Sequence, residues 1–329
     1  MPVTGADPAP ARLTVGIVSA GRVGSAVGAA LERAGHIVFG VSAISDESRR
    51  RAAARLPDSQ ILPPEGVAAR SELLILAVPD AELPGLVAGL AVANAVRPGT
   101  IVAHTSGANG IGVLAPLAAG GALPLAIHPA MTFTGHDEDL ARLGNACFGI
   151  TAVDEIGYAI AQSLVIEMGG EPVRVAEEHR TLYHAALAHG SNHLVTLIID
   201  AVAALRAALA GPGLLGQQAV FGQQTIDDEP NGLAERMLAP LASAALDNAL
   251  RRGQSALTGP VARGDAETVS AHLNALAAAD PRLAAGYRAL SLRTAQRART
   301  NPAIIDLLED GPSNGQARNG QGNPEERHG

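Results

Sequence analysis

The chain contains no lysine, since all 24 of its basic residues are arginines. Without a lysine amine the protein cannot form a Schiff base with a carbonyl substrate, and no lysine can serve as a general acid or base. Cys147 is the only cysteine, which excludes a disulfide within the chain and is typical of a reducing compartment. We therefore expect a cytoplasmic protein.

Aromatic residues are also scarce, at 2% of the chain, and the formal net charge is −8. Nucleic-acid binding proteins present a basic surface and aromatic rings for stacking, so this function class is disfavoured. No stretch reaches the roughly 18 consecutive apolar residues of a membrane-spanning helix. The first residues, MPVTGADPAPAR, lack the basic and apolar regions of a secretory signal. We expect neither a nucleic-acid nor a membrane partner.

What is present suggests two domains within 329 residues, of which 47% are hydrophobic. Between residues 12 and 176, helical stretches alternate with the runs LTVGIVS, HIVFGVS, ELLILAVPD, GTIVAHTS and LPLAIH, and then FGITAV and EPVRVA. This alternation predicts an α/β fold with a Rossmann-type doubly wound parallel sheet. From residue 177 to 308 the apolar residues follow helical spacing, which predicts an all-α C-terminal domain. The polar ends, residues 1–11 and 309–329, are expected to be disordered.

The segment SAGRVG follows the first strand run and opens the first helical stretch. It is the dinucleotide-binding fingerprint with its first glycine replaced by Ser19, whose side chain must fit a tight turn. Gly21 would let the backbone approach a pyrophosphate, and Gly24 would let the helix pack closely on the strand. An ordinary glycine-rich turn is the alternative. The expected cofactor contacts are Ser19, Ala20, Gly21, Arg22, Val23 and Gly24.

The second strand run, HIVFGVS, ends without the Asp or Glu that grips the ribose hydroxyls of NAD. Hydroxyl and guanidinium groups suited to the 2′-phosphate of NADP follow instead: Ser42, Ser45, Arg49, Arg50 and Arg51. Asp46 lies among them, and the arginines could equally form a solvated first turn of the next helix. The sequence therefore favours NADP over NAD.

Several further stretches resemble a known family. LILAVPD resembles the cofactor loop of reductases related to 6-phosphogluconate dehydrogenase, which include pyrroline-5-carboxylate reductase, ketopantoate reductase and prephenate dehydrogenase. With VAHTSGA, IHPAMTF, LYHAALAHGSNHLV and LTGPVARGD, it resembles the Rossmann-like proteins that carry the domain of unknown function 2520, over about residues 13–302. The resemblance implies a ketopantoate reductase-like activity. It also implies that the cofactor contacts include Ala77, Val78, Pro79 and Thr105.

Two polar segments end successive strand runs, where open α/β sheets bind their ligands. Ser106 could hold a substrate carboxylate or the nicotinamide amide, whereas His104 is expected to be structural. His128, in LAIHPAMTFTG, could donate the proton that hydride transfer to a ketone requires, because histidine titrates in the right range. A buried structural histidine is the alternative. The similarity to prephenate dehydrogenases implies that His128 hydrogen-bonds a substrate hydroxyl or carbonyl.

The same resemblance bears on the long apolar helix expected around LYHAALAHGSNHLV. In the related reductases this helix carries a lysine and, four residues later, an asparagine that face the nicotinamide. Asn192 matches the asparagine, but Ala188 occupies the lysine position, and His184 on the same helical face could replace it. His189 and His193 are spaced to chelate a metal, but a zinc site needs a third ligand, so we expect no metal.

Residues late in the chain offer substrate contacts with lower specificity. Asp265 has the chemistry of a helix N-cap, whereas Arg263 could clamp a carboxylate with two hydrogen bonds. Asn248 and its neighbour Asp247 could also line the site.

These features lead to one main hypothesis and two alternatives. The main hypothesis is an NADP-dependent reductase of a small keto acid, with ketopantoate as the first candidate and with Ser106, His128, His184 and Asn192 in the active site. The alternatives are an imine reductase of the pyrroline-5-carboxylate type and a non-catalytic NADP-binding sensor. The segment TLIIDAVAALRAAL is apolar on more than one face, which predicts a homodimer that covers it.

Overall fold

The computed structural model describes residues 12–210 and 232–309. The predictions of disorder for residues 1–11 and 310–329 lie outside the described residues. The chain divides into two compact units, Met1–Asn192 and His193–Gly329, which we describe one at a time.

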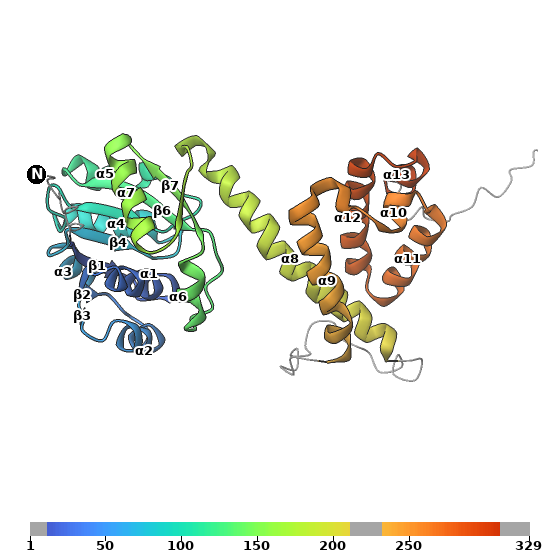
Figure 1. Ribbon diagram of the computed structural model, residues 1–329, viewed down its shortest axis with the longest axis horizontal. Helices are drawn as coiled ribbons and strands as arrows, with labels where there is room; N and C mark the ends of the chain where they lie inside the picture. The colour runs from blue at the N-terminus through green and yellow to red at the C-terminus, as the bar shows by residue number, and fades with distance from the viewer. Residues whose placement is uncertain (1–11, 211–231, 310–329) are drawn as a thin grey trace, which may run out of the picture. The chain divides into compact units, whose positions relative to one another are not determined.

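The first unit is built on one eight-stranded sheet with the order β3-β2-β1-β4-β5-β6-β7-β8 (Figure 1). The strands are β1 (Thr14–Val18), β2 (Ile37–Val41), β3 (Gln60–Ile61), β4 (Leu73–Leu76), β5 (Ile101–His104), β6 (Leu123–Pro129), β7 (Cys147–Ala152) and β8 (Glu171–Arg174). The first six strands in this order, from β3 through β1 to β6, are parallel to one another. Their carboxyl ends therefore lie at one edge of the sheet. The prediction of a Rossmann-type doubly wound sheet is confirmed.

The sheet departs from the parallel pattern at one pair, because β7 runs antiparallel to β6. The connection between them stays at the edge where β6 ends, and an antiparallel partner can start there without a crossover. The next connection is a crossover through a helix, so β8 is again parallel to β7. This reversal places Gly149 of β7 directly opposite His128 of β6.

Helices cover both faces of the sheet. They are α1 (Arg22–Arg33), α2 (Asp46–Arg55), α3 (Pro64–Ala68), α4 (Leu83–Val92), α5 (Ala115–Ala119), α6 (Glu138–Leu143) and α7 (Glu155–Glu167). Because side chains alternate along a strand, Leu73 and Ile75 of β4 join the core beneath α1 and α7. Leu74 and Leu76 join the opposite core beneath α3, α4 and α5.

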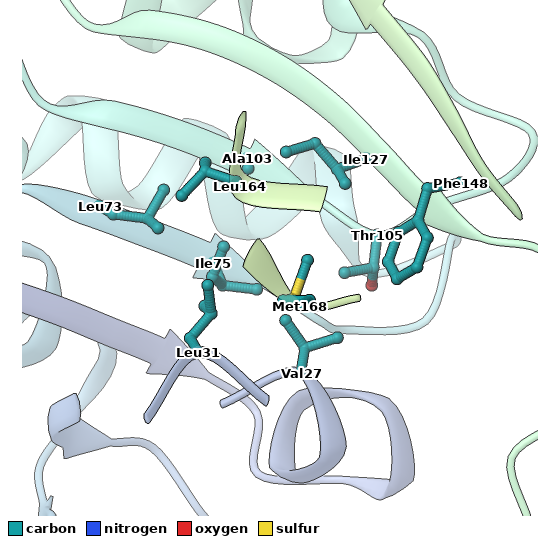
Figure 2. Close-up of a pocket in the computed structure, with 10 residues that line it drawn as sticks. All are labelled: Val27, Leu31, Leu73, Ile75, Ala103, Thr105, Ile127, Phe148, Leu164 and Met168. Atoms are coloured by element: carbon teal, nitrogen blue, oxygen red, sulfur yellow. The ribbon is translucent and has the colours of Figure 1, made fainter. Parts of the chain in front are cut away.

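The core under α1 and α7 contains one small gap of about 10 Å³ (Figure 2). Its lining is Val27, Leu31, Leu73, Ile75, Ala103, Thr105, Ile127, Phe148, Leu164 and Met168. A space of this size holds one water molecule at most, and its walls are apolar apart from Thr105. It is a packing defect of the core and is too small for a substrate.

Only helices follow β8 among the residues that the structure describes. They are α8 (Arg180–Leu209), α9 (Leu233–Arg252), α10 (Gly259–Arg263), α11 (Ala266–Ala279), α12 (Pro281–Ala298) and α13 (Pro302–Glu309). The first turns of α8 belong to the sheet unit, and its remainder belongs to the helical unit. Val269 and Leu273 of α11 pack with Ala295 of α12 in the core of the helical unit. The long helix and the all-α second region are confirmed.

One stretch of the described chain, Glu177–Leu209, is long and apolar enough to cross a membrane by length and composition, with a mean hydropathy of 1.5. A single helix of this kind is weak evidence, because helices of soluble proteins pass the same test.

Candidate functional site

Four segments with chemically informative sequences lie at the carboxyl ends of four neighbouring parallel strands. The fingerprint loop follows β1, the V-P-D turn follows β4, the HTSG segment follows β5, and His128 lies one residue before the end of β6. Ligands of open α/β sheets bind at such carboxyl ends. We therefore take this edge of the sheet as the candidate site.

Ser19 adopts the left-handed conformation, with φ of 75°, that the first glycine of a fingerprint favours. Its backbone N–H donates to Ser42 Oγ at 2.8 Å, and the N–H of Ala20 donates to the carbonyl of Ser42 at the same distance. These two bonds hold the turn against β2, so the structure accommodates the serine. The Ser42 hydroxyl was predicted to bind the cofactor, and in the structure it accepts a hydrogen bond from the fingerprint loop.

The two fingerprint glycines have different surroundings. A methyl group on Gly24 would lie 2.1 Å from the carbonyl oxygen of Ser19 and 3.1 Å from Ala77 Cβ, so close packing requires this glycine. A methyl group on Gly21 would meet only Ser19 Oγ, at 3.5 Å, and the φ of Gly21 is −70°. Protein packing therefore does not explain Gly21. It begins α1 without a side-chain cap, which leaves room for a pyrophosphate to approach the helix N-terminus.

The region after β2 presents the predicted arginines on α2. Ser45 caps this helix by accepting a hydrogen bond from Ser48 N at 3.1 Å. Arg49 is exposed, Arg50 Nε donates to the carbonyl of Asp46, and Arg51 pairs with Glu47. The guanidinium groups therefore lie on α2, directly after β2. This is the position from which they could bind the 2′-phosphate of NADP.

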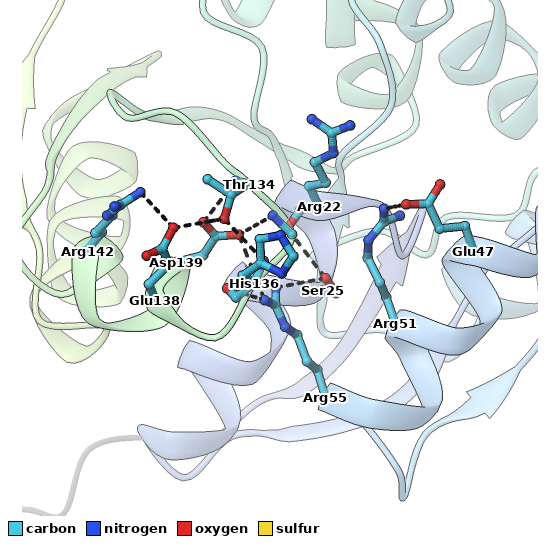
Figure 3. A network of polar contacts seen from close by, with 11 residues as sticks. Arg22, Ser25, Glu47, Arg51, Arg55, Thr134, His136, Glu138, Asp139 and Arg142 are labelled. Carbon is cyan, nitrogen blue, oxygen red and sulfur yellow. Dashed lines mark hydrogen bonds and ion pairs between the residues drawn. The ribbon is translucent and has the colours of Figure 1, made fainter. Parts of the chain in front are cut away.

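The loop that follows β6 lies against α1 and α2, a contact that the sequence gave no reason to expect (Figure 3). Gly135 has a φ of 89°, and a methyl group on it would lie 3.4 Å from Arg51 Nε and 3.5 Å from Arg22 Cγ. Asp139, fully buried, accepts hydrogen bonds from the backbone N–H groups of Thr134 at 2.9 Å and Gly135 at 2.7 Å. Burial alone would raise the pKa of Asp139, but these hydrogen bonds lower it, so a carboxylate holds the loop.

The segment after β5 is fixed by its own side chains. His104, fully buried, accepts from the N–H of Ser106 at Nδ1 and lies 2.9 Å from the carbonyl of Gly110 at Nε2. Burial lowers the pKa of His104 to about 4, so it is neutral and both nitrogens are occupied. Ser106 Oγ accepts from the backbone and the side chain of Asn109, at 3.0 and 2.9 Å. Its hydroxyl proton is still available for a ligand.

Glu177 holds the far end of this segment, a role that the sequence did not suggest. Its carboxylate accepts from the backbone N–H groups of Ile111 at 2.8 Å and Gly112 at 2.9 Å. Gly110 must lack a side chain, because a methyl group there would lie 2.0 Å from the carboxylate. The turn before α8 is thereby tied to the loop that carries Ser106.

His128 lies in a cluster that includes the first turns of α8. Its Nδ1 is 2.8 Å from the hydroxyl of Tyr183, and its ring is edge-on to that of His184 with 6.2 Å between centroids. Its other nitrogen faces Gly107: a methyl group there would stand 2.9 Å from His128 Nε2 and 2.6 Å from His184 Cδ2. The predicted residues Ser106, His128 and His184 are thus brought together, and Tyr183 joins them.

The expectation that His128 titrates near neutrality is wrong. Burial, and then the positive charge of Arg180, lower the pKa of His128 to about 4. The ring is therefore neutral at physiological pH. A neutral imidazole can still donate a hydrogen bond, but it carries no second proton to give away.

Arg180, the first residue of α8, was missed by sequence reasoning and is 1% exposed. Its guanidinium donates to Thr151 Oγ1 at 2.8 Å and to the carbonyls of Gly149 at 2.9 Å, Ala126 at 3.2 Å and Ser106 at 3.4 Å. Within residues 12–210 and 232–309, no carboxylate forms an ion pair with it. These oxygens satisfy its hydrogen bonds, and the Glu177 carboxylate acts on its charge without forming an ion pair, so the site carries a buried guanidinium.

The remaining predicted residues belong to later parts of the chain. Asn192 is exposed on α8, and the eight residues that separate it from His184 correspond to about 12 Å along the helix axis. Arg263 and Asn248 belong to the helical unit, where Asp265 caps α11 by accepting from Thr268 N at 3.1 Å. Among the described residues, no group of three or more His, Cys, Asp or Glu side chains could hold a metal.

The V-P-D turn and Thr105 complete the predicted cofactor residues. Ala77 continues β4 by donating from its backbone to Val18 at 3.0 Å, and it packs against Gly24 of the fingerprint. Thr105 donates from its backbone to Leu76 at 3.1 Å. Val78 and Pro79 follow Ala77 at the same edge of the sheet.

Comparison with known families agrees with this architecture. The model of a Rossmann-like domain matches residues 1–129, and that of the domain of unknown function 2520 matches residues 146–294. No curated protein matches the chain at a significant level. The two family models confirm the resemblance to Rossmann-like proteins that carry the domain of unknown function 2520.

Solved structures share the fold at low sequence identity. A Bacteroides fragilis protein described as an NADP oxidoreductase is 19% identical, with a TM-score of 0.67 over 87% of this chain and 98% of that one. A Thermotoga maritima protein is 19% identical, with a TM-score of 0.59 over the same shares. An imine reductase of Streptomyces aurantiacus is 15% identical, with a TM-score of 0.59 over 90% of this chain and 100% of that one. At these identities the similarity establishes the fold.

Proposed function

We propose that this chain, which combines a Rossmann-like domain with the domain of unknown function 2520, is an NADP-dependent reductase of a small keto acid. The observation that carries the proposal is the cluster of His128, Tyr183 and Arg180 beside Gly107 at the carboxyl ends of β5 and β6. This edge of the sheet also holds the dinucleotide fingerprint.

The cofactor assignment rests on the room at Gly21 and on the charges near the end of β2. The N-terminus of α1 would hold the pyrophosphate, and the arginines near the end of β2 (Arg22, Arg49, Arg50 and Arg51) would surround the 2′-phosphate of NADP. When bound, NADPH supplies the hydride. The names of the structural relatives, which include an NADP oxidoreductase, support this choice.

The charge of the site favours an anionic substrate. Arg180 is buried behind His128, and its field stabilises both a substrate carboxylate and the negative charge that develops on a ketone oxygen during reduction. The same field disfavours the iminium cation that an imine reductase binds. The site therefore favours the keto acid over the imine, although the fold is shared with imine reductases.

Ketopantoate is the keto acid that we propose first, on the resemblance in sequence. A panel of 2-keto acids and cyclic imines, followed by the loss of NADPH absorbance, tests the assignment. We expect turnover with keto acids and none with imines. Binding of NADPH without turnover of any compound would instead indicate a sensor.

The choice of cofactor has its own test. NADPH should raise the melting temperature more than NADH at equal concentration, because tighter binding to the folded state stabilises it more. Arg49→Ala and Arg50→Ala should each reduce the difference between the melting-temperature shifts caused by NADPH and NADH. Arg297→Ala, in the helical unit, serves as the control and should leave this difference unchanged. Equal shifts with both cofactors in the parent protein would refute the NADP assignment.

We also propose that the protein is a homodimer through its helical region. Large apolar side chains are exposed on α8 and α9, among them Val195 at 58%, Leu241 at 70% and Leu250 at 79%. A second copy is the simplest cover for such surfaces. Sedimentation should give a dimer at micromolar concentration, and a monomer would refute this proposal.

A further inference from the structure

A neutral histidine poses a problem for ketone reduction, which the surroundings of His128 resolve. The oxygen of a reduced ketone needs a proton, and a neutral imidazole that gave up its only N–H proton would become an anion. One ring nitrogen of His128 must therefore receive a proton while the other nitrogen gives its proton to the substrate oxygen. The structure places one candidate donor on the far side of the ring, which is Tyr183.

Tyr183, on α8, is held in place by its contacts with His128 of β6 and Gly149 of β7. Its hydroxyl lies 2.8 Å from His128 Nδ1, and the two rings are edge-on with 5.6 Å between centroids. A methyl group on Gly149 would lie 2.6 Å from the hydroxyl oxygen, so the absence of a side chain at Gly149 makes room for the phenol. Gly149 is paired with His128 across β6 and β7, so the two strands fix the imidazole beside the space that the phenol occupies.

The protonation states of the two groups allow the Tyr183 hydroxyl to donate this hydrogen bond. Burial raises the pKa of Tyr183, so the phenol keeps its proton at neutral pH. The imidazole of His128 is neutral, so one of its nitrogens is an acceptor. Donation from the Tyr183 hydroxyl to Nδ1 leaves the ring proton on Nε2, the nitrogen that faces Gly107.

We propose that Tyr183 is a positioning residue that holds His128 with its Nε2 proton toward the substrate and passes its own proton to Nδ1. The proposal rests on the function proposed above. The hydride adds to the carbonyl carbon and the C=O π pair moves to oxygen, which takes the Nε2 proton of His128. Nδ1 takes the hydroxyl proton of Tyr183 at the same time, so the imidazole stays neutral. The tyrosinate then takes its proton back from Nδ1, and Nε2 regains a proton from water, which restores the starting tautomer.

Arg180 supplies the charge that this transfer needs. Its guanidinium carbon lies 5.7 Å from the centre of the Tyr183 ring. A buried positive charge at this distance favours negative charge on the phenol oxygen and on the substrate oxygen. The same residue bonds the backbone of Gly149 and Ala126, so it also fixes the strands on which the contact depends.

The other charged or titratable groups around His128 come from three elements. Arg180, Tyr183 and His184 belong to α8, His104 ends β5, and Asp80 follows β4. Only Asp80 among these favours the protonated ring, and it is exposed. The protonation state of His128 is therefore governed by burial and by Arg180.

The test is Tyr183→Phe, which removes one oxygen and keeps the ring. With NADPH and the best keto acid of the panel, kcat should fall by roughly 10- to 100-fold, while the KM for the keto acid and the affinity for NADPH change little. The chain offers a matched control: the Tyr287 hydroxyl lies 2.9 Å from His272 Nδ1 in the helical unit, with rings again edge-on. Tyr287→Phe removes the same type of hydrogen bond and should leave kcat unchanged.

A second readout does not depend on turnover. In protein labelled with ¹⁵N-histidine, the nitrogen shifts of His128 should show the proton on Nε2 in the parent and a mixture of tautomers in Tyr183→Phe. Gly149→Ala, which displaces the hydroxyl without altering Tyr183, should give the same mixture.

The outcomes separate the two proposals. Full kcat in Tyr183→Phe, or a parent ring with its proton on Nδ1, would overturn the role of Tyr183 and leave the reductase assignment intact. A parent enzyme that oxidises no NADPH against any keto acid would overturn the proposed function, and the proton transfer with it.

Discussion

In the described part of the chain, two histidine–tyrosine pairs are almost alike as pairs and differ in their surroundings. In each, a tyrosine hydroxyl lies within 3 Å of a histidine Nδ1, at 2.8 Å for His128 and 2.9 Å for His272. His272 is exposed on a helix. His128 lies near the end of β6, beside Gly107 of the loop after β5 and close to the buried Arg180. The pair becomes a candidate for catalysis only where burial and a fixed charge control its protons.

The largest expected effect concerns the two histidines themselves. His128→Asn should keep its affinity for NADPH and lose kcat by roughly 100- to 10,000-fold, because the proton donor is removed while the cofactor loop is untouched. His272→Asn should retain the parent kcat. NADPH titration and steady-state kinetics on both variants check this. Substantial turnover by His128→Asn would favour imine reduction, in which the substrate brings its own proton.

A smaller effect is expected on stability at mildly acid pH. His104 and His128 have pKa values lowered from 6.5 to about 4 in the folded state, so between these values the unfolded chain binds protons that the folded chain does not. The free energy of unfolding should therefore be unaffected above pH 6.5 and fall as pH decreases toward 4. Each pKa unit corresponds to about 1.4 kcal/mol, so the loss should reach a few kcal/mol.

Urea denaturation at pH 7 and pH 5 measures this loss, and it avoids the range in which most carboxylates titrate. His104→Asn should reduce the difference in the free energy of unfolding between the two pH values, because one of the two histidines with a lowered pKa is gone. His272→Asn should leave the difference as it is in the parent. An equal change in both variants would show that burial of His104 does not govern the acid response.

Much of the first unit could be predicted from the sequence, because its signals are local. The alternation of strand and helix runs, the fingerprint around Gly21 and Gly24, and the placement of His104 and His128 at strand ends all depend on residues close together in the chain. Asp265 also could be read locally, since an N-cap needs only the N–H groups two or three residues ahead.

Other parts of the site depend on contacts between residues far apart. Tyr183 and His128 are separated by 55 positions, and Glu177 and Ile111 by 66. No periodicity or motif links such residues, so the sequence pointed to His184 and gave no role to Tyr183 or Glu177. The pKa of His128 was wrongly predicted for the same reason, because its value depends on burial and on a charge that the fold brings beside it.

The sequence by itself determined the class of fold, the dinucleotide fingerprint and the strand ends at which polar side chains gather. Each of these follows from backbone preference and hydrophobic periodicity, which act over a few residues. Only the tertiary structure decided that Gly149 makes room for Tyr183 and that Arg180 lies buried without an ion pair among the residues described. Proton positions in a buried site depend on distances between separate elements, and those distances exist only after the sheet and α8 have packed together.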